Sequence, residues 1–400
     1  MSSSRSMPDG GTAEDASVLA IQNARVLPSP DSPPIERCTV VVERGTIVAV
    51  EPDAPIPATA QVIPGEGRVV TAGFWNAHAH FTEGKWRAVA RRPAVVLDVH
   101  LHDMFTSRGF TTVVDVGSDP RVTLSLRRRV DSGAVLGPSI YTAGPGVYPP
   151  HGMPYYLRET IPFWYRPFLP QPGNVRAARR AVRRNLARGA DLVKLFTGSY
   201  VARGTVRTMP EPIARAAVEL AHASGRLVYS HPSNLEGTLV AVRSGVDVLA
   251  HPPDATDGVE TSVLQEMVDR RMGMVPTLKM FADTVSKNAD YLEPIYDVVR
   301  RFHALRGELL FGTDVGYMTD YATEDEFLAL SRCGLDGREI LRMLTTAPAR
   351  RFGVGGVVGT VTRGARADLA VLDDDPREHP LAFTRVRATI RAGRVLHLRP

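Results

Sequence analysis

Cysteine is nearly missing from the 400-residue sequence, which contains only Cys38 and Cys333. Two thiols so far apart form no disulfide framework and no thiolate metal site. Both are predicted to be inert residues of the core. A metal site in this chain is therefore expected to be free of thiolate ligands.

Long apolar runs are missing as well. No stretch reaches the roughly 18 to 20 consecutive apolar residues that a membrane span requires, so no membrane partner is expected. Residues 1–16 are polar and lack the apolar segment of a secretory leader. We expect a disordered tail over residues 1–16 and a cytoplasmic protein.

A concentrated basic surface is the third absence, although the formal net charge is +5. The 48 lysines and arginines are dispersed and balanced by 43 acidic residues, without a basic arm or interleaved aromatic residues. This distribution is not that of a nucleic-acid-binding protein. We expect a small-molecule substrate and no nucleic acid partner, while assembly into a homo-oligomer stays open.

Lysine is the scarce basic residue, since the chain has four lysines, namely Lys85, Lys194, Lys279 and Lys287. Arginine supplies the other basic positions. Lys194 stands inside the apolar run Asp191-Leu-Val-Lys-Leu-Phe196. A lysine kept in such a run requires a chemical reason.

Short apolar runs alternate with amphipathic segments from about residue 70 onward. Near-continuous apolar runs are typical of parallel strands covered on both faces. The strand candidates are residues 68–75, 111–117, 139–143, 191–196, 226–230, 246–250, 273–278 and 308–312. The helix candidates include residues 175–188, 211–224, 235–244 and 262–271. A glycine follows each of them within two residues, as is typical of a helix C-terminus.

Eight strands with helical crossovers predict an α/β fold, a (β/α)8 TIM barrel over residues 71–356. The active site of such a barrel lies at the C-terminal ends of its strands. An open doubly wound sheet is the alternative. No glycine-rich phosphate-binding motif follows the first strand, which disfavours the nucleotide-binding version of that sheet.

The two flanks of the barrel have a different texture, with short strands and turns over residues 17–70 and 357–397. Neither flank alone has enough strands to bury a core. Together they are predicted to form one small composite β-sandwich domain.

A long loop rich in proline and aromatic residues follows the third strand, from Gly144 to Pro172. Loops of this length are uncommon unless they are functional. We expect it to lie over the mouth of the barrel and to shape the substrate pocket, or otherwise to cover core or a subunit interface. The predicted substrate contacts are Tyr148, His151, Tyr155, Trp164 and, after the fifth strand, Ser233.

Residues able to bind metal follow several of the predicted strands. His78 and His80 end the first strand, and side chains two positions apart on a strand point to the same side. Imidazole is a common metal ligand. The other groups are Lys194 in the fourth strand, His231 after the fifth, His251 after the sixth and Asp314 after the eighth.

Each of these groups has a simpler explanation when it is taken alone. His231 or His251 could be a hydrogen-bonded core histidine, Asp314 could cap a helix, and Lys194 could pair with a carboxylate. Independent accidents would scatter such residues over both ends of the strands. Their common position at the C-terminal ends therefore predicts one metal site.

The set resembles the amidohydrolase superfamily, specifically its imidazolonepropionase-like and prolidase-like members. The likeness runs from about residue 17 to residue 397. It includes Leu344-Thr-Thr-Ala-Pro-Ala-Arg350 and the segment 359–372, which are similar to the family's final helix and its return to the small β domain.

The resemblance implies a binuclear metal centre. By similarity, His78, His80 and Asp314 would hold the more buried ion, and His231 and His251 the more exposed ion. Lys194, N-carboxylated by CO2, would bridge both ions, which gives the lysine its chemical reason. Zn2+ suits this ligand set, with Mn2+, Fe2+ or Co2+ as alternatives.

The implied reaction is hydrolysis by a metal-bridged hydroxide, with Asp314 as the general base. The bond would be C–N, in an amide, a cyclic amide, an N-acyl amino acid or a peptide. The alternatives are an ester or lactone hydrolase, a non-hydrolytic lyase or isomerase on the same two-metal site, and a barrel scaffold without activity.

Some positions depart from the family pattern. Asn76 stands where the first strand commonly has an aspartate, which removes a carboxylate that could orient His78. Ser233 replaces a histidine that prolidase-like members often have, and Met209 replaces an aromatic substrate contact. A dipeptidase is therefore less well supported than an amidohydrolase in general. Pro232-Ser-Asn234 stands in place of the glutamate of the deaminases, which disfavours deamination.

Overall fold

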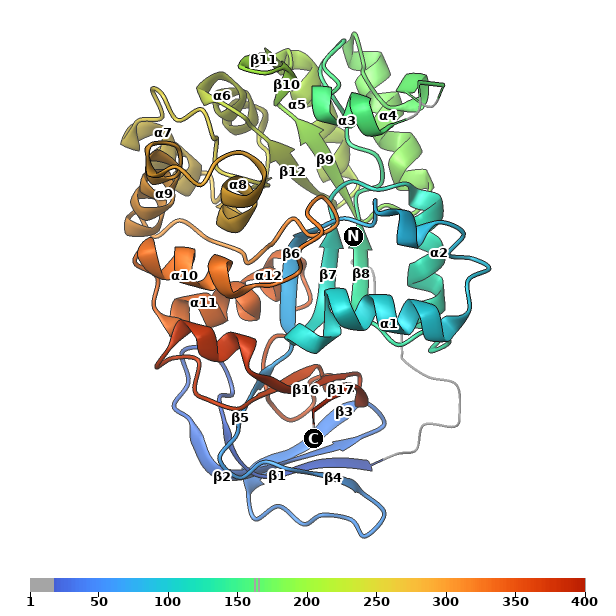
Figure 1. The fold of residues 1–400 in the computed structure, drawn as a ribbon, viewed down its shortest axis with the longest axis vertical. Coiled ribbons are helices and arrows are strands. Elements are labelled where there is room, and N and C mark those ends of the chain that lie inside the picture. Colours follow the sequence, from blue (N-terminus) through green and yellow to red (C-terminus); the bar gives the residue numbers. More distant parts are fainter. Residues whose placement is uncertain (1–17, 162, 165, 400) are drawn as a thin grey trace.

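The computed structural model describes residues 18–161, 163–164 and 166–399. The predicted disordered tail of residues 1–16 lies outside this part of the chain. The fold is a mixed α/β arrangement, with one large sheet at one end and shorter parallel strands surrounded by helices at the other (Figure 1).

Strands from both ends of the sequence share the large sheet. It contains β1 (Val18–Val26), β2 (Ile35–Glu43), β3 (Thr46–Pro52), β4 (Gln61–Pro64), β5 (Val69–Ala72), β15 (Leu369–Leu372), β16 (Val386–Arg391) and β17 (Arg394–Leu398). Its order is β17-β16-β15-β5-β1-β2-β3, and β4 pairs with β1. The antiparallel pairing of β5 with β15 joins the two flanks. The division of the chain into separate domains stays a prediction.

The first predicted strand, residues 68–75, is two strands. β5 ends at Ala72, and β6 (Phe74–Ala79) begins a different sheet. Gly73 makes the change, because its N–H donates to Asp368 O at 2.8 Å while Phe74 N donates to Gly109 O at 2.9 Å. A Cβ on Gly73 would lie 2.3 Å from Thr111 Cγ2, so only glycine fits this corner.

The shorter strands form two parallel sheets. One contains β6, β7 (Phe110–Asp115) and β8 (Ser139–Thr142). The other contains β9 (Leu192–Phe196), β12 (Leu227–His231), β13 (Val248–Leu249) and β14 (Gly273–Met274). A two-stranded hairpin, β10 (Gly198–Ala202) and β11 (Thr205–Thr208), follows β9.

Backbone hydrogen bonds link the two parallel sheets. On one side Asp191 N donates to Thr142 O at 2.7 Å. On the other, Leu310 N donates to Met274 O at 2.9 Å and Ala77 N to Phe311 O at 2.7 Å. Residues 308–312 make isolated contacts and no strand, so the described residues show no single closed sheet. The arrangement is consistent with a barrel.

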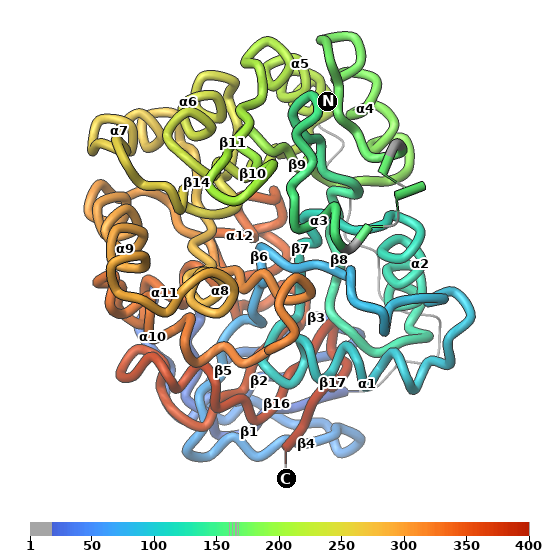
Figure 2. Tube along the Cα trace, turned by 45° about the horizontal axis from the view of Figure 1, so that its top comes forward, coloured from blue at the N-terminus to red at the C-terminus, as the bar shows by residue number. Residues whose placement is uncertain are grey.

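Helices cover the outside of the parallel strands (Figure 2). They are α1 (Ala94–Met104), α2 (Pro120–Asp131), α3 (Tyr155–Thr160), α4 (Val175–Ala187), α5 (Glu211–Ala223), α6 (Leu235–Ser244), α7 (Thr261–Asp269), α8 (Leu278–Thr284), α9 (Ala289–Ala304), α10 (Glu324–Arg332), α11 (Gly337–Leu344) and α12 (Thr346–Arg351). The four helices predicted from their periodicity, α4 to α7, are confirmed to within two residues at each end. Within the residues that the structure describes, no helix has the length and apolar character needed to cross a membrane.

Helix ends follow ordinary capping chemistry. Asn174 caps α4 by accepting from Ala177 N, and Asn234 caps α6 by accepting from Gly237 N. Asp336 and Glu339 form a reciprocal capping box at the start of α11. The cap at Asn234 matters for the site, because it fixes the turn that immediately follows His231.

Candidate metal centre

The predicted metal-binding groups meet at one place. The Nε2 or Nδ1 atoms of His78 and His251 and a carboxylate oxygen of Asp314 lie within 4.8 Å of one another, and all three residues are buried. The ring centroids of His78 and His251 are 4.4 Å apart, those of His231 and His251 4.8 Å, and those of His78 and His80 5.3 Å. Residues separated by more than two hundred positions thus form one cluster.

Asp314 is at the centre of the cluster. Its Oδ1 lies 3.0 Å from His80 Nε2 and 3.3 Å from His78 Nε2, and its Oδ2 lies 3.7 Å from His251 Nε2. One carboxylate therefore faces three imidazole nitrogens.

The opposite edges of the three rings are already hydrogen-bonded. His78 Nδ1 lies 2.8 Å from Ala250 O, and His80 Nδ1 lies 3.0 Å from Gly117 O. Because a carbonyl oxygen only accepts, each Nδ1 carries the proton and each Nε2 presents a lone pair. The hydroxyl of Thr277 donates to Pro276 O at 2.8 Å, so it accepts from His251 Nδ1 at 2.6 Å.

The Nε2 lone pairs of the three histidines consequently face the Asp314 carboxylate, which also can only accept a hydrogen bond. His78 Nε2 and Asp314 Oδ1 are buried and have no hydrogen-bond partner within the described residues. Two acceptors held about 3 Å apart repel unless a cation lies between them. The donor atoms present thus fit a divalent metal ion with nitrogen and oxygen ligands.

Backbone geometry places Asp314 against the end of β6. Asp314 adopts the left-handed region with φ 58°, and its N–H donates to His78 O at 2.9 Å. Two glycines allow this close approach. A Cβ on Gly312 would lie 2.8 Å from the Cβ of His78, and a Cβ on Gly316 would lie 2.0 Å from His80 O.

Burial holds the imidazoles in the form that binds metal. It lowers the pKa of His78 to about 4 and that of His231 to about 3, and it brings the pKa of His251 well below its usual value. These three rings are therefore neutral at pH 7. Burial opposes ionisation of Asp314, but its contacts with His78 and His80 outweigh this effect and hold its pKa well below the usual value.

Lys194 is buried, with 2% of its surface exposed. Its Nζ lies 5.4 Å from the centre of the Phe196 ring. Desolvation lowers its pKa from 10.5 to about 7, against the opposing charge of Asp314. A substantial fraction of the Lys194 amine is therefore unprotonated at neutral pH.

His231 occupies the last position of β12 and stacks on Phe196, with ring centroids 5.1 Å apart and an angle of 24°. The register of β12 and β9 pairs His231 with Phe196. In this way the strand that carries Lys194 also orients His231.

Asn76 does not contact the ring of His78. Its Oδ1 accepts from the backbone N–H of His78 at 3.1 Å, and its Nδ2 donates to Thr313 Oγ1 at 2.7 Å. The orienting role that an aspartate would have is taken by Ala250 O. Asn76 instead ties β6 to the turn that carries Asp314.

Sequence reasoning missed two polar residues that support the histidines. Asp115, fully buried at the end of β7, accepts from Ser118 Oγ, Thr123 Oγ1 and Thr142 Oγ1, and lies 4.0 Å from His80 Nδ1. Thr277 orients His251 from a left-handed conformation with φ 46°, a strained one for a β-branched residue. Both lie near the C-terminal ends of the strand candidates 111–117 and 273–278, the position that singled out the histidines.

The predicted substrate contacts fall into different environments. Tyr148 is buried and packs on Phe196, with ring centroids 4.7 Å apart. Ser233 is buried, and its Oγ has no hydrogen-bond partner among the described residues. Tyr155 is half-buried, whereas His151 and Trp164 are exposed, Trp164 to 62%. The roles of these five residues stay predictions.

Tyr156, the neighbour of the predicted contact Tyr155, is influenced by the charge of the cluster. Burial, then Tyr317 and Tyr148, then the charges of Asp314 and Asp254 raise its pKa well above the usual value. Its ring centroid is 5.7 Å from that of Tyr317. Tyr156 belongs to α3, and Tyr317 lies three residues after Asp314.

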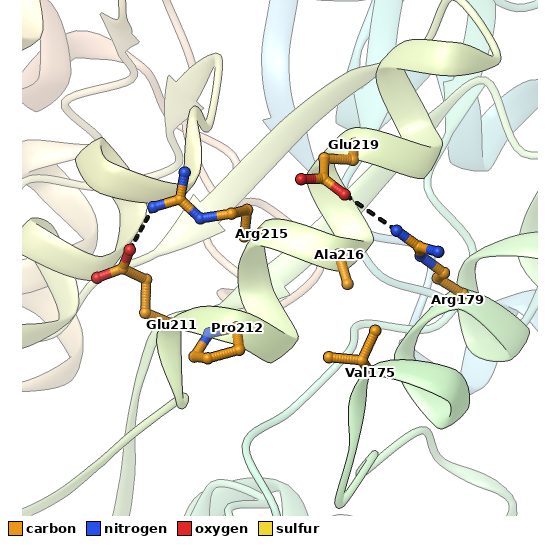
Figure 3. Close-up of a pocket in the computed structure, with 7 residues that line it drawn as sticks. All are labelled: Val175, Arg179, Glu211, Pro212, Arg215, Ala216 and Glu219. Atoms are coloured by element: carbon orange, nitrogen blue, oxygen red, sulfur yellow. Dashed lines mark hydrogen bonds and ion pairs between the residues drawn. The ribbon is translucent and has the colours of Figure 1, made fainter.

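A separate pocket lies on the outer surface between α4 and α5 (Figure 3). Its lining includes two ion pairs, Arg179 with Glu219 and Arg215 with Glu211. None of the predicted site residues lines it. Paired charged side chains on the surfaces of two helices form this pocket. The candidate functional site is therefore the buried cluster.

Comparison with known proteins identifies the family. The family model of the amidohydrolase family matches residues 69–396, most of the chain. The protein belongs to the amidohydrolase family, which confirms the resemblance seen in the sequence.

Individual relatives are more distant. Uncharacterized proteins of Mycobacterium tuberculosis and Mycobacterium bovis are 27% identical over 231 residues. These alignments cover 54% of this chain and only 60% of the length of the relatives.

Several solved structures share the fold. A Xaa-Pro dipeptidase with bound methionine has 22% identity and a TM-score of 0.81, covering 95% of this chain and 99% of that chain. A prolidase complexed with N-methylphosphonate-L-proline has 24% identity and a TM-score of 0.78, with the same two coverages. Molinate hydrolase has 18% identity and a TM-score of 0.76, covering 95% and 94%.

Proposed function

We propose that this protein is a metal-dependent hydrolase that cleaves a C–N bond in an amide, a cyclic amide, an N-acyl amino acid or a peptide. The observation that carries the proposal is the set of imidazole lone pairs facing the Asp314 carboxylate with no proton between them. Family membership supports the same class of reaction.

In this proposal His78, His80 and Asp314 hold one divalent ion, and His231 and His251 hold a second. Zn2+ suits the imidazole-rich and thiolate-free set. Paired ions supply a water of lowered pKa and polarise the scissile carbonyl. The two parallel sheets and residues 308–312 would then form the wall of a (β/α)8 barrel. The ligands would lie at the C-terminal ends of its strands.

Lys194 is the proposed bridge between the two ions. Its unprotonated amine attacks CO2, a C–N bond forms, and one proton is released, which leaves a carbamate with two ligand oxygens. The depressed pKa near 7 provides the free amine at neutral pH. Arginine could not serve here, because its guanidinium stays protonated.

Asp314 is the proposed general base. Its low pKa keeps it ionised, so the carboxylate would accept the proton of the attacking water. The same carboxyl group then delivers this proton to the leaving nitrogen. Asn76 and the left-handed turn at Asp314 hold the carboxylate in place for both transfers.

The structural neighbours bear the names of hydrolases with different substrates, including a dipeptidase, molinate hydrolase and phenylurea hydrolase B. The test must therefore use a broad panel. Zinc-loaded and manganese-loaded protein would be assayed on N-acyl amino acids, dipeptides, cyclic imides and lactones, with chelated protein as the control. We expect metal-dependent hydrolysis of at least one C–N substrate. Turnover of lactones alone would contradict the proposal.

A further inference from the structure

A second carboxylate lies outside the metal cluster, on the loop that follows β13. Asp254 comes three residues after His251. Its Oδ2 accepts from the hydroxyl of Tyr200 at 3.1 Å and from that of Tyr291 at 3.4 Å. The hairpin strand β10, the β13 loop and helix α9 thus converge on a single carboxylate oxygen.

No cation neutralises this carboxylate within the part of the chain that the structure describes, where the hydrogen-bond partners of Asp254 are tyrosines and backbone amides. Burial raises the pKa of Asp254 to about 6, so the group is still an anion above neutral pH. Asp254 is half-buried, and a partly desolvated anion without a counter-charge favours a cationic ligand.

The charges of Asp254 and of the metal cluster both act on Tyr156. The charges of Asp314 and Asp254 both contribute to raising the pKa of Tyr156, after burial and the neighbouring tyrosines. Ring centroids are 5.5 Å apart for Tyr155 and Tyr156, and 5.7 Å apart for Tyr156 and Tyr317. Asp254 follows His251 by three residues, so it lies at the same end of the strands as the metal cluster.

Asp254 and the two tyrosine hydroxyls offer a ligand only hydrogen-bond acceptors. Because the two phenols donate their protons to Asp254, their oxygens present only lone pairs to a ligand. A carboxylate and two phenol oxygens form a set of acceptors. An alkylammonium group, with three N–H donors and a positive charge, complements this set, and the aromatic rings add cation–π attraction.

We propose that Asp254, held by Tyr200 and Tyr291, is a substrate-binding subsite for a protonated primary amine. The inference rests on the proposed function, because it places the scissile bond at the metal cluster and the amine at Asp254, on the loop that follows His251. It assigns Asp254 a specificity role and leaves the chemical step to the metal-binding residues.

A binding experiment tests the subsite without requiring turnover. Benzylammonium and benzyl alcohol would be titrated by calorimetry at pH 8 into zinc-loaded protein and into chelator-treated protein. We expect benzylammonium to bind about tenfold or more tightly than the alcohol in both forms. Asp254→Asn should abolish this preference, and the double variant Tyr200→Phe/Tyr291→Phe, which keeps the carboxylate, should reduce it.

The exposed Asp290, beside Tyr291 in the first turn of α9, provides a matched control. Asp290→Asn removes the same charge and should retain the preference. Equal binding of the amine and the alcohol to wild type would overturn the proposal, and so would an unchanged preference in Asp254→Asn. Melting temperatures of all variants would show that each is folded.

Hydrolysis of a matched pair separates this subsite from the proposed function. Asp254→Asn should raise KM for an N-acyl-lysine and leave KM for the corresponding N-acyl-norleucine unchanged. If wild type hydrolyses no C–N substrate but still prefers benzylammonium, the proposed function fails and the amine subsite stands. If N-acyl substrates are hydrolysed with no effect of Asp254→Asn on either KM, the subsite fails and the proposed function stands.

Discussion

At the residue scale, the important property of the cluster is that hydrogen bonds fix the outer nitrogens of three histidines. Three Nδ1 atoms are committed to acceptors, which leaves their Nε2 atoms directed at Asp314. Hydrogen bonds to the outer nitrogen of a ligating histidine fix its tautomer and its orientation. The supporting residues should therefore affect metal affinity without touching the metal.

Thr277 allows a direct test of this idea. Thr277→Val removes the acceptor for His251 Nδ1 and preserves the side-chain shape. We expect the affinity for Zn2+ to fall by about 10- to 100-fold, as measured by competition with a chromophoric chelator. Thr277→Ser keeps the hydroxyl and should bind zinc as wild type does. Equal affinities for the valine and serine variants would contradict the orienting role.

The cluster could be predicted from the sequence because alternation along a strand and position at its end are local properties. His78 and His80 could be paired from their spacing alone. The contact of Thr277 with His251 could not be predicted in detail, since it depends on how two neighbouring loops turn. The role of Trp164, an exposed residue of the long loop, stays a prediction.

At the element scale, the cluster depends on close contact between the end of β6 and the turn at residues 312–316. Gly316 has φ 96° and faces His80 O directly. Gly316→Ala would require a Cβ 2.0 Å from that oxygen. We expect a loss of about 2 kcal/mol or more in the free energy of unfolding, together with weaker metal binding.

Gly364 is a suitable control for this substitution. It also has a positive φ, 88°, but a Cβ there would meet no atom within 4 Å. Gly364→Ala should therefore lose only about 1 kcal/mol, with metal binding unchanged. Chemical denaturation of the two variants would separate the effect of the close contact from that of backbone strain. Equal losses would mean that the contact with His80 has no energetic importance.

Helices α8 and α10 are joined by a buried acid that makes stability depend on pH. Glu326 accepts from Lys279 N at 2.7 Å, and burial raises its pKa from 4.5 to about 7. Between these two values the folded chain holds a proton that the unfolded chain has lost, so stability falls as pH rises through this window. Glu326→Gln keeps the acceptor and removes the titration.

We therefore expect Glu326→Gln to be more stable than wild type at pH 8, by on the order of 2 kcal/mol, and to match it at pH 4.5. Denaturant midpoints at both pH values would measure the difference. Glu324→Gln, at an exposed position in the same helical turn, should show no such pH dependence. A constant difference between Glu326→Gln and wild type across this range would contradict the burial effect.

At the scale of the whole molecule, the alternation of apolar runs and amphipathic segments predicted the α/β class and four helices well. It misplaced the boundary at Gly73, because a continuous apolar run carries no mark of where the chain changes sheets. Strand character at residues 308–312 was also overestimated, since this segment makes isolated backbone contacts in place of a ladder. Both differences arise from long-range pairing, which local sequence does not encode.

The proposed chemistry depends on the whole fold, which would bring ligands from five separate strand ends to one pair of metal ions. The most direct test is the metal content of protein purified without chelator and measured by plasma mass spectrometry. We predict about two divalent ions per wild-type chain, fewer in Lys194→Ala, and an unchanged content in the exposed control Lys287→Ala. Fewer than about one ion per wild-type chain, or the same content in Lys194→Ala, would contradict the two-metal centre bridged by Lys194.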